Sequence, residues 1–347
     1  MGRLLKWAGK RPLARVAGLS LMATGLGACA TIADNGDELT RIEAVLGKHI
    51  AELSGPDYGG RMPGTPGGAA TQDYIVAALE SYGFKPGMRG QWRQDVTVPT
   101  KRYRELLVDV PEGADSIASA NVIGVLPGTI ADSGAVVLLA HWDHLGTCGP
   151  PAAPDRLCNG AVDNASGVAV MLEIARRIAE HGPLERDLYV VATTAEEAGL
   201  VGAEAFADDP PVPLPIIVAA FNLDSVAIAP RGAPVAVIGW GRTGLDAGIV
   251  EVVRAQGRRL SNTQQQARWI ARQDGYALLK RDVPSVLVSS AFADERRLGQ
   301  FVDKNYHRAT DDWSAAIELG GAAQDMLLQI ALLRHFGNTA SYPVGDD

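Results

Sequence analysis

The sequence predicts an α/β fold in a single domain, with a mostly parallel central sheet sandwiched by helices. Short continuous apolar runs, such as residues 135–140, are typical of strands that are buried on both faces. Amphipathic helical patterns alternate with these runs along the chain, as they do in βαβ units. No Pro- or Ser-rich linker divides the 347 residues, which favours one domain over two.

The composition is that of a globular protein. The chain is 47% hydrophobic and 21% charged, which argues against disorder and against a multi-span membrane protein. Its formal net charge of −8 gives no electrostatic reason to expect a nucleic acid as partner.

The first 28 residues have the pattern of a lipoprotein-type signal peptide. A basic segment without acids precedes an apolar stretch at 16–26, which is too short to span a bilayer. That stretch ends in Leu26-Gly27-Ala28-Cys29, which resembles a bacterial lipobox and predicts a lipid anchor on Cys29, followed by a tether at 29–37. The alternative is an ordinary cleavage site at Ala28-Cys29-Ala30, which would give a free periplasmic protein. Both interpretations predict export, and the first predicts an outer-membrane lipoprotein that faces the periplasm.

Two further cysteines, Cys148 and Cys158, lie close together in a stretch rich in Gly and Pro. In an oxidising compartment such a pair is expected to form a disulfide. The alternative is a pair of free thiols that bind metal, which is disfavoured because better ligands flank them on both sides.

The elements of the domain, predicted over residues 38–340, follow from the periodicity of apolar residues and from helix-ending signals. The first helix is expected near 38–50, and residues 59–67 form a Gly- and Pro-rich loop. A second helix near 69–82 stops at a glycine, and β-type alternation broken by Pro and Gly covers 92–130. The remaining elements are strands at 135–140, 188–193, 216–223, 235–239 and 284–289, and helices at 164–181, 196–207, 243–257 and 312–336.

Polar side chains follow three of the buried strands at the point where each strand ends. His141 follows the strand at 135–140, and Glu196 and Glu197 follow the strand at 188–193. Asp224 follows the next strand. The carboxyl ends of strands form the ligand-binding crevice of open parallel sheets, so these groups are expected on one rim.

Each of these residues has an ordinary structural explanation when it is taken alone. Asp163 could be the N-cap of a helix, and Glu196 and Glu197 could complement a helix dipole. Together these explanations fail, because acids buried at one sheet edge repel each other unless cations hold them there. Two zinc ions would satisfy the cluster, since zinc accepts imidazole and carboxylate ligands and zinc pairs share a bridge. Asp143 is well placed to orient the imidazole of His141.

Five ordered motifs are similar to those of the co-catalytic zinc exopeptidase family. This family contains bacterial leucyl aminopeptidases, and secreted glutamate carboxypeptidases and glutaminyl cyclases are related to it. The resemblance covers roughly residues 45 to 335, and five motifs in order are far more specific than any one alone. The motifs lie at 140–146, 159–167, 194–200, 222–224 and 306–312, and the segment 60–67 is similar to the family's opening motif.

The resemblance implies a site with two zinc ions. One zinc would be held by His141 and Asp224. The other would be held by Glu197 and His307. Asp163 would bridge the two ions.

The resemblance also implies that Glu196 is the general base, which would pass a proton from a water molecule to the leaving amine. The sequence departs from the family at Gln273-Asp274-Gly275, where members often carry Ser-Asp-His. A histidine that shapes the substrate pocket is therefore absent, which leaves the substrate preference open.

The predicted function is hydrolysis of peptide bonds at peptide N-termini by a two-zinc aminopeptidase, with a peptide as substrate. A carboxypeptidase or dipeptidase of the same fold is the nearest alternative, and Arg272, Arg281 and Arg308 leave it open because arginine binds carboxylates. A glutaminyl cyclase is disfavoured, since those relatives generally work with one zinc. A non-catalytic binding protein is disfavoured because all five ligands and the base are present.

Overall fold

The structure is a computed structural model that describes residues 36–262, 264–314 and 316–343. The predicted signal peptide at 1–28, its lipidation site Cys29 and the tether up to residue 35 lie outside these residues. Residues 34–347 form one unit by their contacts, which agrees with the single predicted domain. Among the described residues, no helix is both long enough and apolar enough to cross a membrane.

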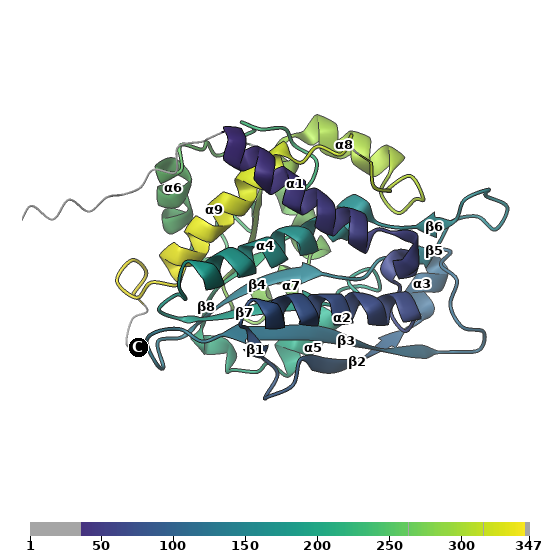
Figure 1. Ribbon diagram of the computed structural model, residues 1–347, viewed down its shortest axis with the longest axis horizontal. Coiled ribbons are helices and arrows are strands. Elements are labelled where there is room, and N and C mark those ends of the chain that lie inside the picture. The colour runs from purple at the N-terminus through teal and green to yellow at the C-terminus, as the bar shows by residue number, and fades with distance from the viewer. Residues whose placement is uncertain (1–35, 263, 315, 344–347) are drawn as a thin grey trace, which may run out of the picture. The chain divides into compact units, whose positions relative to one another are not determined.

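An eight-stranded sheet forms the centre of this unit, in the order β1-β3-β7-β4-β8-β10-β9, with β2 paired to β3 (Figure 1). The four central strands β7, β4, β8 and β10 are parallel, and the strands on both sides of them pair antiparallel. The strands are β1 (Lys85–Pro86), β2 (Arg93–Pro99), β3 (Ser116–Leu126), β4 (Ala135–His141), β7 (Asp187–Thr193), β8 (Ile217–Asn222), β9 (Ala236–Ile238) and β10 (Ser285–Ser289), and a separate hairpin contains β5 (Gly146–Thr147) and β6 (Leu157–Cys158).

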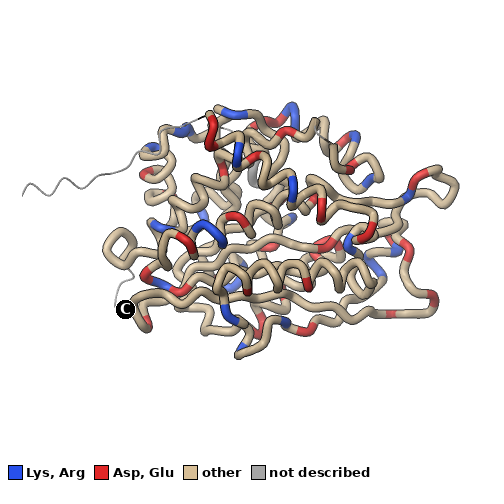
Figure 2. Tube along the Cα trace, in the orientation of Figure 1, with Lys and Arg blue, Asp and Glu red and all other residues tan. Residues whose placement is uncertain are grey.

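Helices cover both faces of the sheet, as expected for strands that are apolar on both sides. The described α-helices are α1 (Gly36–Leu53), α2 (Pro66–Ser81), α3 (Lys101–Glu105), α4 (Gly167–Glu180), α5 (Val201–Asp208), α6 (Asp246–Ala255), α7 (Gly275–Leu279), α8 (Glu295–Lys304) and α9 (Gly320–Phe336). Shorter 3-10 helices lie at Pro56–Arg61, Leu214–Ile216, Gln264–Arg272 and Ala291–Ala293, and a π-helical turn lies at Ala161–Ser166. Lys and Arg are interspersed with Asp and Glu along the trace (Figure 2).

The buried strand β4 shows how the two layers of helices are held. Val136 and Leu138 pack into the core that α1, α2, α4 and α9 share. Val137 and Leu139 point to the opposite side and pack with residues of α5 and α7. Alternate residues of one continuous apolar run therefore serve two cores, which is why the run shows no polar alternation.

Several predicted boundaries differ from those in the structure, mostly beside the polar rim of the sheet. The helices predicted from 164, 196 and 312 begin instead at Gly167, Val201 and Gly320. The first two of these helices are preceded by turns that present Asp163 and Glu196, so these groups lie outside the helices. At the other end, α1 begins at Gly36, so the last two residues of the predicted tether are helical. The region 92–130 contains the short helix α3, which its β-type pattern did not indicate.

Glu173 of α4 is a fully buried carboxylate that is bound by two arginines. It accepts hydrogen bonds of 2.7 Å from Arg176 and from Arg177, and Arg177 also reaches Glu38 of α1 at 3.0 Å. Burial alone would raise the pKa of Glu173, but the two arginines outweigh it and lower the pKa. The charged carboxylate of Glu173 therefore holds Arg177, and Arg177 in turn links α4 to Glu38 of α1.

Replacing Glu173 by Gln is expected to lower the free energy of unfolding by about 2 kcal/mol or more at neutral pH, because two partly buried arginines lose their anion. A lowered pKa stabilises the fold above the unfolded-state pKa of about 4.3, and this contribution is lost as pH falls through the folded-state pKa. The difference in the free energy of unfolding between the wild-type protein and Glu173→Gln should therefore become smaller in acid. Urea denaturation at two pH values measures it, and Glu180→Gln, which removes an exposed partner of Arg176, should cost under about 0.5 kcal/mol. Equal losses of unfolding free energy in Glu173→Gln and Glu180→Gln would contradict the stabilising role assigned to the buried carboxylate of Glu173.

Candidate metal centre

The ends of three neighbouring parallel strands position most of the predicted site residues. His141 is the last residue of β4, Glu196 and Glu197 follow β7, and Asp224 follows β8. Because β7, β4 and β8 are adjacent and parallel, their carboxyl ends meet on one side of the sheet. The structure thus brings these side chains together at the predicted rim.

Asp163 lies between two groups of potential metal ligands. Its Oδ1 is 3.3 Å from Nε2 of His141, and that nitrogen is 3.7 Å from Oδ1 of Asp224. Its Oδ2 is 3.6 Å from Nε2 of His307. The two oxygens of one carboxylate therefore face two different clusters. Asp163 is also common to the two potential metal-binding groups found among the described residues, which are His141 with Asp163 and Asp224, and His144 with Asp163 and Glu197.

The second cluster contains a histidine to which the sequence analysis assigned no role. Oε2 of Glu197 is 2.7 Å from Nε2 of His307, and Oε1 of Glu197 is 2.7 Å from Nδ1 of His144. His144 is fully buried and lies 3.9 Å from Oδ2 of Asp163. It belongs to the same motif as His141, so a buried second histidine in that motif was the available signal.

Two buried side chains clamp the loops of the centre together. Asp311 accepts hydrogen bonds from the backbone N–H groups of Val162 and Asp163, at 2.9 and 3.0 Å, which ties the loop of His307 to Asp163. Asn164 donates to the carbonyl of Leu223 at 2.9 Å and accepts from the N–H of Ser225 at 3.2 Å. Asp163 is therefore fixed relative to the loops that carry both other sets of ligands.

Arg61, from the opening motif, is a buried cation that gathers backbone carbonyls from three parts of the chain. It donates to the carbonyls of Leu53, Trp142, Asn159 and Gly160 over 2.5–2.9 Å. Burial lowers the pKa of Arg61 to about 10, and Asp311 and other acids oppose this shift, so the side chain stays charged at neutral pH. Arg61 thereby joins the residue after His141 to the segment that leads into Asp163.

Three residues of the centre have left-handed backbone conformations without being glycine. Ala195 precedes Glu196 and has φ 54°, Ser225 follows Asp224 and has φ 49°, and His307 has φ 58°. Each such conformation costs on the order of 1–3 kcal/mol and persists only where the surroundings enforce it. Strain of this kind gathers at functional sites, and here it lies beside three of the predicted functional residues.

The carboxylates and imidazoles strongly shift each other's pKa values. Burial lowers the pKa of His141, but pairing with Asp143, Asp163 and Asp224 outweighs burial, and the pKa lies well above its usual value. Burial raises the pKa of Glu197, but the close charges of His307 and His144 dominate, and the pKa lies well below its usual value.

The donor atoms of the centre fit metal ions. Oδ2 of Asp163, Oε1 of Glu197, Nε2 of His307 and both ring nitrogens of His144 are buried without a partner in hydrogen-bond geometry. Unpaired buried polar atoms are costly, and imidazole nitrogens beside carboxylate oxygens are the donor set that zinc prefers. The residues present therefore suit a zinc centre.

Asp143 lies beside His141, but its carboxylate does not make the expected hydrogen bond. Nδ1 of His141 is 3.2 Å from the backbone carbonyl of Asp143 and 3.7 Å from Oδ1 of Asp143. That Oδ1 accepts a hydrogen bond of 3.2 Å from the N–H of Glu196. The carbonyl of Asp143 is therefore the group that orients the ring, and its carboxylate fixes the backbone of Glu196.

Cys148 and Cys158 are joined by a disulfide that closes the hairpin of β5 and β6. Sγ of Cys148 is 3.7 Å from the backbone carbonyl of His307. The hairpin therefore lies directly against the loop that carries His307.

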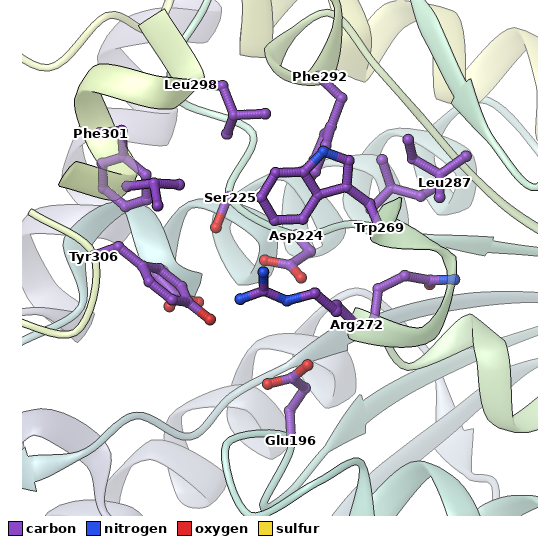
Figure 3. Close-up of a pocket in the computed structure, with 14 residues that line it drawn as sticks. Glu196, Asp224, Ser225, Trp269, Arg272, Leu287, Phe292, Leu298, Phe301 and Tyr306 are labelled. Atoms are coloured by element: carbon purple, nitrogen blue, oxygen red, sulfur yellow. The ribbon is translucent and has the colours of Figure 1, made fainter. Parts of the chain in front are cut away.

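A cavity opens beside the centre (Figure 3). Asp163, Glu196 and Asp224 are among its lining residues. The other lining residues are largely apolar and aromatic and include Ile238, Trp269, Leu287, Phe292, Leu298, Phe301, Val302 and Tyr306.

Of the three arginines that left a carboxypeptidase open, one lines this cavity. Arg281 pairs with Glu204 and Asp208. Arg308 donates to the backbone carbonyls of Val302 and Asp303. Arg272 is the one that reaches the cavity.

A sequence profile described as peptidase family M28 matches residues 121–331 of the chain. The chain is 30% identical over 164 residues to the alkaline phosphatase isozyme conversion protein of Escherichia coli, which aligns 45% of this chain and 42% of that protein. It is 36% identical over 91 residues to aminopeptidase YwaD of Bacillus subtilis, which aligns 26% of this chain and 18% of that protein. The chain thus spans less than half of the length of these curated relatives.

Solved structures of similar fold include BSAP, a zinc aminopeptidase from Bacillus subtilis, with a TM-score of 0.60 and 16% identity over 84% of this chain and 94% of that one. A Zn-dependent exopeptidase from Parabacteroides distasonis has a TM-score of 0.58 and 20% identity over 89% and 98% of the two chains. A glutaminyl cyclase from Porphyromonas gingivalis has a TM-score of 0.57 and 19% identity over 85% and 96%.

Proposed function

The chain belongs to peptidase family M28, and on that basis we propose that it is a two-zinc aminopeptidase, which hydrolyses the first peptide bond of its substrates. The observation that carries this proposal is the placement of Asp163. Its two carboxylate oxygens face two separate sets of donor atoms, as a bridge between two metal ions requires. A centre for a single metal has no need of the second set.

In this proposal His141 and Asp224 would hold one zinc, and Glu197 and His307 would hold the other. Asp163 would be a ligand of both. When bound, the two ions would make a water molecule acidic enough to lose a proton near neutral pH and would polarise the scissile carbonyl.

His144 is proposed to orient Glu197, whose Oε1 lies 2.7 Å from its Nδ1. A histidine in this position restrains the carboxylate that also faces His307. Ligand carboxylates are generally held in this way by neighbouring groups.

Glu196 is the proposed general base. It is half-buried, lines the cavity and stands next to Glu197 in the sequence. Burial, together with the charges of Glu197 and Asp224, raises its pKa well above the usual value, although His141 opposes the shift. A carboxylate with a raised pKa is suited to accept a proton from water and to give it up to the leaving amine.

The dipeptidase or carboxypeptidase is retained as a second candidate because Arg272 lines the cavity.

The N-terminal pattern further leads us to propose an exported enzyme that is anchored through Cys29 and meets peptides outside the cytoplasm.

Free and N-acetylated aminoacyl-anilides, assayed with and without chelator, test the function. We expect hydrolysis of the free-amine substrates to fall by at least about 100-fold on chelation and to return with added zinc. Acetylation should abolish cleavage, because an aminopeptidase requires the free amine. Equal cleavage of acetylated substrates would exclude an aminopeptidase, and cyclisation of N-terminal glutamine without hydrolysis would identify a cyclase.

A further inference from the structure

The cavity beside the metal centre has a single cationic side chain among its described lining residues, that of Arg272. Its lining residues include three carboxylates and a larger number of apolar and aromatic side chains. In Figure 3 the guanidinium of Arg272 is seen between the carboxylates of Asp224 and Glu196. A substrate bound in the cavity would therefore lie beside this group.

Arg272 is held by an aromatic ring and not by an acid. Its guanidinium carbon lies 4.9 Å from the centre of the Trp269 ring, and Trp269 in turn packs edge-on against Phe292 at 5.7 Å. Within the described part of the chain, this stacking is the only interaction of the Arg272 guanidinium, with no carboxylate or carbonyl at ion-pair or hydrogen-bond distance. Its planar set of N–H donors is thus oriented by the ring and available to a ligand.

Arg272 is not needed to neutralise the charge of the proposed metal centre. Two zinc ions would balance the charges of the four carboxylates of Asp163, Glu196, Glu197 and Asp224. The proposed loaded centre is therefore close to neutral and needs no further cation. A guanidinium beside it, against apolar walls, retains its preference for an anion.

We propose that Arg272 binds a carboxylate of the substrate, so that the enzyme prefers short peptides with a negative charge close to the scissile bond. This inference rests on the proposed peptidase function and names its substrate class. The carboxylate is either the free C-terminus of a dipeptide or an acidic side chain next to the scissile bond. Both present the same planar pair of oxygens to the guanidinium.

Two matched pairs of substrates test the inference on the zinc-loaded full chain. Leu-Gly against Leu-Gly-amide examines the free carboxylate, and Leu-Glu-amide against Leu-Gln-amide examines the acidic side chain. We expect the charged member of at least one pair to have a kcat/KM at least about 10-fold higher, and the pair that responds identifies the source. Arg272→Met should abolish this preference mainly through KM, with unchanged zinc content.

Arg268→Met is the matched control, because Arg268 stacks on the same Trp269 ring at 5.1 Å but does not line the cavity. This variant should keep the preference. If the wild-type enzyme showed no preference for the charged substrates, the inference would be overturned without any variant. Persistence of the preference in Arg272→Met, or its equal loss in Arg268→Met, would also overturn it. Failure of the wild-type enzyme to hydrolyse any of the four substrates would instead overturn the proposed function.

Discussion

Glu196→Gln is expected to retain the full zinc content of the protein and to lose on the order of 10²–10⁴-fold in kcat. Glu196 lines the cavity, whereas the donor atoms of the two clusters belong to other residues. Glutamine has nearly the same shape but cannot accept the proton of the attacking water. Binding of substrate should therefore persist while the chemical step is lost. Zinc analysis and kcat for a leucyl-anilide measure the two effects.

Glu197→Gln is the matched control, since it makes the same chemical change one residue further along. Glu197 faces two histidines at 2.7 Å, so this variant should lose one zinc together with activity. If Glu196→Gln lost zinc to the same degree, Glu196 would be a ligand. If it cleaved the anilide at the normal rate, the proposed mechanism would be wrong.

Asp163→Asn should remove both zinc ions, whereas Asp224→Asn should remove only one. The two oxygens of Asp163 face different clusters, and an amide has one oxygen acceptor and no negative charge, so it cannot serve both. Asp224 belongs to one cluster alone. Activity of Asp163→Asn should fall by at least about 100-fold.

Metal analysis of the two variants measures this difference, and thermal unfolding supplies an independent readout. Zinc that binds only the folded protein raises Tm, so chelation should lower the Tm of the wild-type protein and leave that of Asp163→Asn almost unchanged. Two zinc ions retained by Asp163→Asn would exclude a bridge. A single zinc in the wild-type protein would exclude the two-metal centre altogether.

The parallel centre of the sheet was predictable because its strands are continuous apolar runs, and β4 shows why such runs arise, with alternate residues in two cores. The antiparallel strands at the sides were not predicted, since strand direction depends on pairing partners that lie far away in the sequence. The predicted start of the last helix at 312 was wrong, since the helix begins at Gly320. The side chains of Asp311 and Asp312, at the predicted start, accept hydrogen bonds from Asp163 and Asn159, which are far away in the sequence.

The residues of the candidate centre could be named from the sequence because each lies in a short motif, and three of these motifs include or directly follow the end of a buried strand. The roles of the supporting residues could not be predicted, because they exist only across long distances in the chain. Asp311 accepts from the N–H of Asp163, from which it is separated by 148 positions. Asp274 is fully buried behind the centre, where it accepts a hydrogen bond from Thr193, and burial raises its pKa to about 7. Asp311 lies in the motif at 306–312 and Asp274 in the segment 273–275, but neither segment indicates which distant group its aspartate contacts.

The position of Arg61 bears on how small an autonomous enzyme of this kind can be. The family profile begins at residue 121 and ends at 331, and this interval contains every proposed zinc ligand and the base. The guanidinium that draws together the carbonyls of Trp142, Asn159 and Gly160 comes from outside the interval. A fragment limited to the matched interval would hold every proposed zinc ligand and the proposed base, yet it would lack the group that joins these loops. We therefore expect the smallest active fragment to be larger than the stretch by which the family is recognised.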